Sequence, residues 1–246
     1  MIKTVVGLLL SVLSLAVVAD NEQFCSQRGQ PRFAQSHVAD EVNRLSFVNA
    51  GGLFNGGVCW WHSRFTRNAA YVANFQPHEA KPSLAQARRI IHAIRLGTAI
   101  VDVPGYSDLQ TFSIDFHNEI QAKLNEWQVV EGDWMRGLAG RTSEAPDRLA
   151  SRMDELYQRV VVNQELVYQK LQLPGITSHA WLVIHMVRES NGYLLTVADS
   201  NSLTLNTRRY TRGSTQMMYG DKGFVPYIEF QDELRSLEQV VRNHCR

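Results

Sequence analysis

Hydrophobic positions between residue 59 and about residue 171 recur every three or four residues, which is the spacing of one buried face of a helix. Four helical segments are predicted from these stripes, over residues 59–75, 83–97, 112–127 and 149–171. Pro77 stops the first segment, while Ser83 and Gly97 are typical of the two ends of the second. We expect the apolar stripes to form much of the core.

After Pro174-Gly175 the pattern changes to short apolar runs separated by Asn, Asp and Gly turns. The predicted strands are residues 179–187, 193–198, 203–210, 215–219 and 224–230, and a last helix covers 232–243. Helices followed by a run of strands indicate an α+β fold. We expect one domain over residues 20–246, with a helical lobe at about 50–172 and a β lobe at about 175–230. A cleft between such lobes is the usual place for a site.

The first 19 residues have the pattern of a secretory signal peptide. A short cationic start with Lys3 precedes an apolar run over residues 5–18, and Ala19 ends this run just before a polar segment. The run is too short to cross a bilayer core of ~30 Å comfortably, and no later apolar run is long enough. The mature protein is therefore expected to be secreted or periplasmic, with no membrane span after signal cleavage.

Charge is nearly balanced, with 25 Lys and Arg against 24 Asp and Glu in 246 residues and a formal net charge of +1. A protein that neutralises many phosphates needs a clustered excess of basic side chains. We therefore expect no nucleic-acid partner. The hydrophobic content of 44% is ordinary for a chain that buries a core.

The chain has three cysteines, Cys25, Cys59 and Cys245. In an oxidising compartment two of them would pair, and Cys25 and Cys245 lie near the two mature termini, which often meet on a domain surface. We expect a Cys25–Cys245 disulfide and a free Cys59. Most free cysteines are buried and inert, so counting alone leaves the role of Cys59 open.

Three short segments carry side chains suited to catalysis. Gly56-Gly57-Val58-Cys59 places a thiol where a helix begins, and the partial positive charge of a helix start favours a thiolate and can bind an oxyanion. His179 opens a predicted strand, and the next strand ends in Asp199-Ser200-Asn201. A hairpin that turns near Asn191-Gly192 would bring Asp199 or Asn201 beside His179, where either side chain would fix the imidazole tautomer.

These segments resemble the motifs of the papain-like cysteine peptidase superfamily, in its bacterial, secreted branch. In that family a Gly-rich loop precedes a Cys that opens a long helix and is followed by Trp, as in Gly56-Gly57-Val58-Cys59-Trp60. His179-Ala180 is similar to the family's His-Ala, and Asp199-Ser200 stands where the family has Asn-Ser. His179 follows Cys59 by 120 residues and Asp199 follows it by 140, near the family's spacing of roughly 130–150.

The resemblance implies a papain-like fold and hydrolysis of a peptide or protein substrate through a thioester, without cofactor or metal. It implies that Cys59 is the nucleophile, that His179 is its base, and that Asp199 orients the imidazole. A hairpin centred near residue 190 would set position 179 opposite about 201, which favours Asn201. The family match favours Asp199, and a one- or two-residue offset in the turn would remove the conflict. We adopt Asp199, with Asn201 as the alternative third member.

The chain also departs from the family. Six residues before the nucleophile, where the family has a Gln that completes the oxyanion hole, this chain has Leu53, and Asn55 is the candidate amide donor instead. The third position is Asp rather than Asn. Only 39 residues of the expected mature chain precede Cys59, so we expect no zymogen.

Other interpretations start from the same residues. Cys59, His62, His179 and His185 suit zinc chemically, but His179 and His185 lie roughly 20 Å apart on one strand at ~3.3 Å per residue. Trp60 and Trp61 fit either core or a cleft wall, and Arg208, Arg209 and Arg212 fit a solvated turn. A transglutaminase-like, deamidating or acyl-transferring enzyme would keep the nucleophile and change the acceptor, whereas a binding module would keep only the fold.

Overall fold

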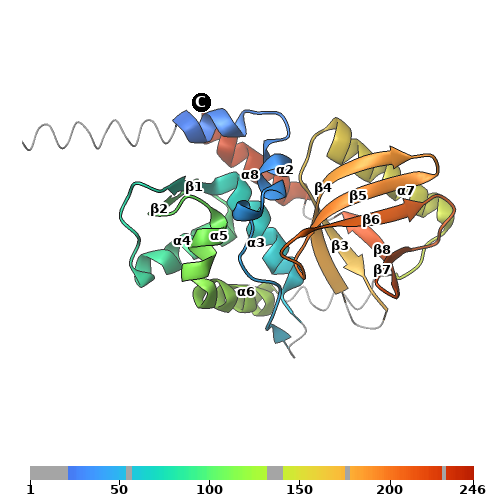
Figure 1. Ribbon diagram of the computed structural model, residues 1–246, viewed down its shortest axis with the longest axis horizontal. Helices are drawn as coiled ribbons and strands as arrows, with labels where there is room; N and C mark the ends of the chain where they lie inside the picture. The colour runs from blue at the N-terminus through green and yellow to red at the C-terminus, as the bar shows by residue number, and fades with distance from the viewer. Residues whose placement is uncertain (1–21, 54–56, 132–140, 175–177, 229–230) are drawn as a thin grey trace, which may run out of the picture.

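The computed structural model describes residues 22–53, 57–131, 141–174, 178–228 and 231–246. The predicted signal peptide, residues 1–19, lies outside these residues. The fold is α+β, as predicted: helices gather at one end of the molecule and an antiparallel sheet forms the other, with α3 (Cys59–Val72) between them (Figure 1).

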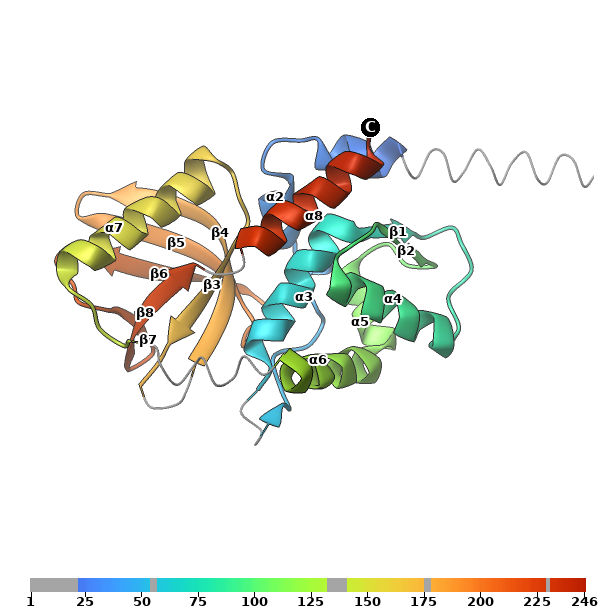
Figure 2. The ribbon, with the colours of Figure 1, turned by 180° about the vertical axis from the view of Figure 1, so that it is seen from behind.

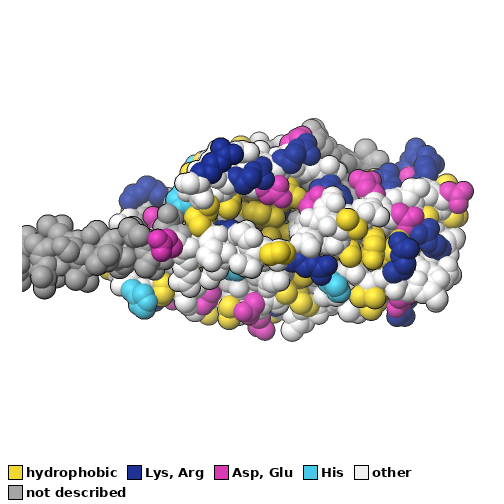
Figure 3. Space-filling model, turned by 90° about the horizontal axis from the view of Figure 1, so that it is seen from above, with side chains coloured by type: hydrophobic (Ala, Val, Ile, Leu, Met, Phe, Trp, Pro, Cys, Tyr) yellow, Lys and Arg dark blue, Asp and Glu magenta, His cyan; other side chains and the backbone are white. Residues whose placement is uncertain are grey.

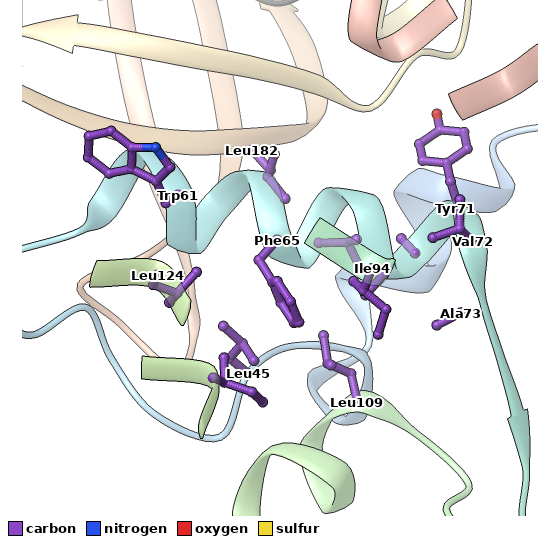
Figure 4. Close-up of a cluster of buried hydrophobic side chains, with 14 of the residues drawn as sticks. Leu45, Trp61, Phe65, Tyr71, Val72, Ala73, Ile94, Leu109, Leu124 and Leu182 are labelled. Atoms are coloured by element: carbon purple, nitrogen blue, oxygen red, sulfur yellow. The ribbon is translucent and has the colours of Figure 1, made fainter. Parts of the chain in front are cut away.

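The helix α3 is the centre of the structure, because every one of its 14 residues is buried. Around it lie α2 (Phe33–Ala39), the short 3-10 helix η1 (Glu41–Asn43), α4 (Leu84–Leu96), α5 (Leu109–Asp115), α6 (His117–Glu131) and α8 (Gln231–His244). Figure 4 shows Leu182 of the sheet on one side of α3, and Ile94 and Leu109 of the surrounding helices on the other. Because α3 is enclosed on all sides, its first residue, Cys59, is held in a fixed position.

The main sheet has six strands in the order β6-β5-β4-β3-β8-β7. Their bounds are β3 (Val167–Gln172), β4 (Ser178–Glu189), β5 (Gly192–Asp199), β6 (Leu205–Thr211), β7 (Met217–Tyr219) and β8 (Lys222–Ile228). One face packs against α3, and the opposite face is covered by α7 (Pro146–Tyr157), which crosses the sheet in Figure 2. Leu149, Met153 and Leu156 of α7 form this second core with Trp181 and Val183 of β4.

The sequence predicted most of these elements. Ser83 caps α4 with a reciprocal capping box and Gly97 ends it in the left-handed conformation, both as expected. The strands β4 and β5 pair antiparallel across the turn at 190–191, which confirms the predicted hairpin.

Three helix predictions were wrong in part. The first helix ends at Val72, and β1 (Ala73–Gln76) then pairs in parallel with β2 (Val101–Pro104). The third divides at Phe116 into α5 and α6. The fourth continues from α7 as a π-helical turn, Gln158–Val162, and its predicted last part is strand β3. All six β3 residues are buried although three of them are polar, so the segment shows neither an apolar run nor a regular alternation, and Leu171 fits the helical spacing. The segment placed at the end of the helical lobe therefore belongs to the sheet.

The predicted disulfide is confirmed. Cys25 and Cys245 are bonded, with their Cα atoms 5.4 Å apart, and Cys59 is free and buried. The disulfide joins the first described segment to the end of α8. Arg28 of the same segment donates to the carbonyl oxygens of Tyr71 and Ala73, so this end of the molecule is tied to the last turn of α3.

Acidic and basic side chains are interspersed on the face in Figure 3, where no single sign of charge dominates. Ion pairs also reach the interior: Arg64 pairs with Glu131 of α6, and Arg64 and Arg67 both pair with Glu233 of α8. Within the described ranges, no helix is long and apolar enough to span a bilayer.

Candidate active site

Cys59 is the first residue of α3 and lies against the beginning of β4. Its Sγ is 3.6 Å from the carbonyl oxygen of Ser178, and the indole N–H of Trp60 donates to the carbonyl oxygen of His179 at 3.2 Å. The first N–H groups of a helix have no partner within that helix and carry partial positive charge. The thiol therefore stands at the positive end of a buried helix, next to an imidazole.

Amide side chains of α6 hold the loop that leads to Cys59. The Asn125 side chain accepts from the Gly52 N–H at 3.1 Å, and the Gln128 side chain accepts from the Leu53 N–H at 2.7 Å. Gln128 also donates to the carbonyl oxygen of Gly57 at 3.1 Å. Gln121 donates to the carbonyl oxygen of Ala50 at 2.9 Å. Spacings of four and three residues place all three amides on one face of α6, a signal that the sequence contained and that our prediction missed.

Asn49 joins this loop to the end of β5. Its side-chain oxygen accepts from the Val58 N–H, its amide group donates to the Asn201 side chain at 3.1 Å, and its backbone N–H donates to the Ser200 carbonyl oxygen at 2.6 Å. Gly57 has φ 85°, and a Cβ on Gly57 would collide with the Asn49 side chain. Glycine is therefore required at Gly57 for two separate reasons.

His179 and Asp199 are in direct contact: Nε2 of the imidazole lies 2.6 Å from Oδ1 of the carboxylate. Trp181 pairs with Asp199 in the sheet, so residue 179 would fall opposite residue 201 if the pairing continued. Near the turn the pairing is offset by one residue, with Glu189 opposite Gly192, but the irregularity between Val183 and His185 removes this offset before Trp181 and Asp199. His179 therefore reaches Asp199 diagonally across the two strands. The side chain of Asn201 bonds elsewhere, to Asn49 and to the Tyr219 hydroxyl.

The site favours a protonated imidazole. Burial by itself lowers the pKa of His179, but the hydrogen bond with Asp199, the neighbouring Cys59 and the Asp199 charge raise it to about 9. Burial likewise favours the neutral form of Asp199, but the His179 contact, the Asn201 N–H and the Arg208 charge hold the pKa of Asp199 below its usual range. Because Nε2 of His179 faces Asp199, Nδ1 is the nitrogen left for Cys59.

Two further side chains complete the surroundings of Asp199, and the sequence prediction had not assigned either to the site. Arg208 of β6 donates to Oδ2 of Asp199 at 3.2 Å, and the ring of Tyr219 lies 5.1 Å from the ring of His179. The interpretation of Arg208 as solvated is wrong, because its side chain is only 21% exposed. Alternation along the strand offered a signal: Arg208 shares the face of the buried Tyr210.

The remaining candidates lie apart from this contact network or outside the described residues. His62 bonds the Phe47 carbonyl oxygen at 2.9 Å, and burial is the main cause that lowers its pKa to about 4, so it is neutral. His185 is exposed on β4. Asn55, the candidate oxyanion donor, falls outside the described residues. Among the residues that the structure describes, no three His, Cys, Asp or Glu side chains lie together as a metal ion would require.

No family model, no curated protein and no solved structure matches this chain. Its chemistry must therefore be deduced from the site. A thiol, an imidazole and a carboxylate lie next to one another, with the imidazole hydrogen-bonded to the carboxylate, and they come from a helix start and two adjacent strands. Such an arrangement can deprotonate a nucleophile and return the proton to a leaving group.

Proposed function

We propose that this protein is a cysteine-dependent hydrolase of papain-like fold that cleaves peptide bonds. The observation that carries this proposal is the position of His179, which is hydrogen-bonded to the buried carboxylate of Asp199 and whose pKa is raised by Asp199 and by the neighbouring Cys59. An inert core thiol needs no imidazole, and a histidine that only fills space needs no buried anion. The two contacts together define a nucleophile, a base and an orienting group.

The reaction starts from the thiolate–imidazolium pair. The Cys59 thiolate attacks the carbonyl carbon of the substrate, and the oxygen gains negative charge while the tetrahedral intermediate forms. Its collapse breaks the C–N bond, and His179 gives its proton to the leaving amine. Water then attacks the thioester carbonyl while His179 takes one proton from that water. Breakage of the C–S bond releases the carboxylic acid and restores the Cys59 thiolate and the His179 imidazolium.

Stabilisation of the oxyanion is assigned to the start of α3. The backbone N–H of Cys59 belongs to the first turn, where the helix leaves its donors unpaired and where a negative charge is favoured. Asn55 remains our proposed second donor. The amides of Asn125 and Gln128 support this role indirectly, since they fix the loop just ahead of the nucleophile.

The papain-like assignment is supported by the distribution of the three residues over the fold. A long buried helix begins with the nucleophile, and an antiparallel sheet packed against that helix supplies His179 at the start of β4 and Asp199 at the end of β5. Both elements are rigid, so the three side chains keep their spacing without an added ion or cofactor.

We also propose that the mature protein acts outside the cytoplasm, after cleavage behind Ala19. The Cys25–Cys245 disulfide supports this proposal, because such bonds persist mainly in oxidising compartments.

Incubation of the mature protein with a mixed peptide library, followed by mass analysis of the products, tests the reaction. We expect fragments that result from backbone cleavage, and we expect them to vanish in Cys59→Ala. Substrates that instead gain about one mass unit on a side chain, or that gain an added amine, would replace hydrolysis by deamidation or acyl transfer. Intact substrates together with an unreactive Cys59 would leave only a binding role.

A further inference from the structure

Asp199 is held by an arginine as well as by the histidine. Its Oδ1 accepts from His179 at 2.6 Å and from the Asn201 N–H at 2.9 Å, while its Oδ2 accepts from Nη2 of Arg208 at 3.2 Å. The Asp199 side chain is 2% exposed. The carboxylate is therefore shared between two cationic partners in a site that water hardly reaches.

The Arg208 guanidinium is fixed by aromatic rings. It lies 5.5 Å from the ring centre of Trp181 and 5.1 Å from that of Tyr219, which suits cation–π attraction. Trp181 is itself held by a hydrogen bond to Gln169 at 2.7 Å. The Tyr219 hydroxyl accepts from Asn201 at 3.2 Å. The Arg208 guanidinium therefore lies near both rings and donates to the carboxylate of Asp199.

We propose that Arg208 is a positioning residue whose charge balances Asp199, so that the carboxylate orients His179 as a neutral amide would. This inference rests on the proposed function. The family that the sequence resembles has Asn at the position of Asp199, and an amide orients an imidazole without adding charge. An Asp–Arg pair has no net charge and keeps the same acceptor oxygen on His179.

The chemistry gives a reason for such a balance. His179 must hold a proton while Cys59 attacks and must release that proton to the leaving amine. A lone buried carboxylate would hold the proton more firmly and would make His179 a weaker acid. A cation on the second carboxylate oxygen reduces this hold and leaves the orienting hydrogen bond intact.

Among the described residues, the cations that pair with Asp199 are His179 and Arg208, and the other ionisable groups near His179 are placed as follows. From α3, Cys59 raises the pKa of His179 and His62 is neutral. Tyr219 of β7 carries no charge near neutral pH, because burial raises its pKa. From β3, Leu171 is the residue opposite His179, and Lys170 lies with its Nζ 3.6 Å from the ring centre of Trp60.

Five variants test the inference: Arg208→Gln, Arg208→Lys, Asp199→Asn, the Arg208→Gln/Asp199→Asn double variant, and Arg209→Gln as the control. Arg209 is the next residue on the strand, is 62% exposed and pairs with Glu189. The readouts are an NMR titration of the His179 ring and the pH dependence of Cys59 alkylation. The titration needs no activity, so it separates this inference from the proposed function.

We expect Arg208→Gln to raise the titration point of His179 by roughly half to one pH unit and Asp199→Asn to lower it by a similar amount. The double variant should return close to wild type, and Arg209→Gln should not move. Arg208→Lys keeps the charge, so it should stay near wild type and shows whether the site tolerates a change at this position.

Two outcomes are decisive. If His179 titrates in Arg208→Gln as in the wild type while wild-type Cys59 is a reactive thiol, the charge-balance role is wrong and the proposed function stands. If His179 shifts as expected but Cys59 reacts as an ordinary thiol in every variant, Arg208 has the proposed electrostatic role and the proposed function fails.

Discussion

At the scale of single residues, the pH dependence of the site is set by the protonation of His179 and the deprotonation of Asp199. The pKa of His179 is about 9 in the folded chain against a usual value of 6.5, so its pairing contributes stability that is complete below 6.5 and is lost as pH rises through 9. The pKa of Asp199 is depressed, so its contribution is present above the usual range of Asp and is lost as pH falls through the lowered value. Between these limits the ion pair is intact.

Replacing the Asp199 carboxylate by an amide should shift the pH range over which the ion pair is intact. In Asp199→Asn the imidazolium loses a negative neighbour, so the upper limb of the pH–rate profile should move below about 9. The rate should fall by roughly 10- to 100-fold, less than when Cys59 is removed. Asn201→Ala should be mild, because Asn201 contributes its backbone N–H to Asp199 and an alanine keeps that group. If Asn201→Ala instead loses most of its activity while Asp199→Asn keeps the wild-type rate, Asn201 is the residue that orients His179.

At the scale of elements, the site depends on how α6 and β5 hold the loop before α3. The sequence signalled this loop by its glycines and placed three amides on one face of α6, but it did not show that these amides bind the loop, because the hydrogen bonds join segments some 70 residues apart. The same limit explains β1 and β2, which pair in parallel across α4. It also explains Arg208, which lies opposite Leu195 in the sheet and reaches Asp199 four residues further along β5, a contact that local sequence cannot fix.

Gln128→Leu tests the loop anchor. The change keeps the size of the side chain but removes its bonds to the Leu53 N–H and to the Gly57 carbonyl oxygen. We expect kcat/KM to fall roughly tenfold, because an oxyanion site misplaced by a fraction of an ångström loses much of its effect. The exposed Val130→Ala on the same helix is the matched control, and equal kinetics in both variants would exclude the anchor role.

At the scale of the whole molecule, two cores share the sheet, and the disulfide closes the chain at the end of α3 opposite to Cys59. The sequence predicted the α+β class, the β4–β5 hairpin and the disulfide, because periodicity, turn residues and cysteine count are local or compositional signals. It did not predict that β3 is a strand beneath α7, since a fully buried strand has no alternation to reveal it.

The disulfide should stabilise the protein without affecting the reaction. It closes a loop with a sequence separation of 220, for which chain entropy predicts a contribution of roughly 5.4 kcal/mol. The Cys25→Ser/Cys245→Ser double variant should therefore unfold at a clearly lower denaturant concentration. Thiol reactivity of Cys59 at 25 °C should persist, because the first turn of α3 is held by other contacts. Loss of that reactivity in a folded double variant would contradict this separation.

The rate of Cys59 alkylation by iodoacetamide at pH 6.5, compared between the wild type and His179→Gln, tests the central claim most directly. If His179 holds the proton of a thiolate–imidazolium pair, the wild type should react at least roughly tenfold faster than the variant. The Cys59 thiol of the variant should become reactive only as the pH approaches ~8.5, the ordinary pKa of a cysteine thiol. Both proteins should react alike after unfolding. Equal rates for the two folded proteins at pH 6.5 would show that Cys59 is a core thiol and would contradict the account.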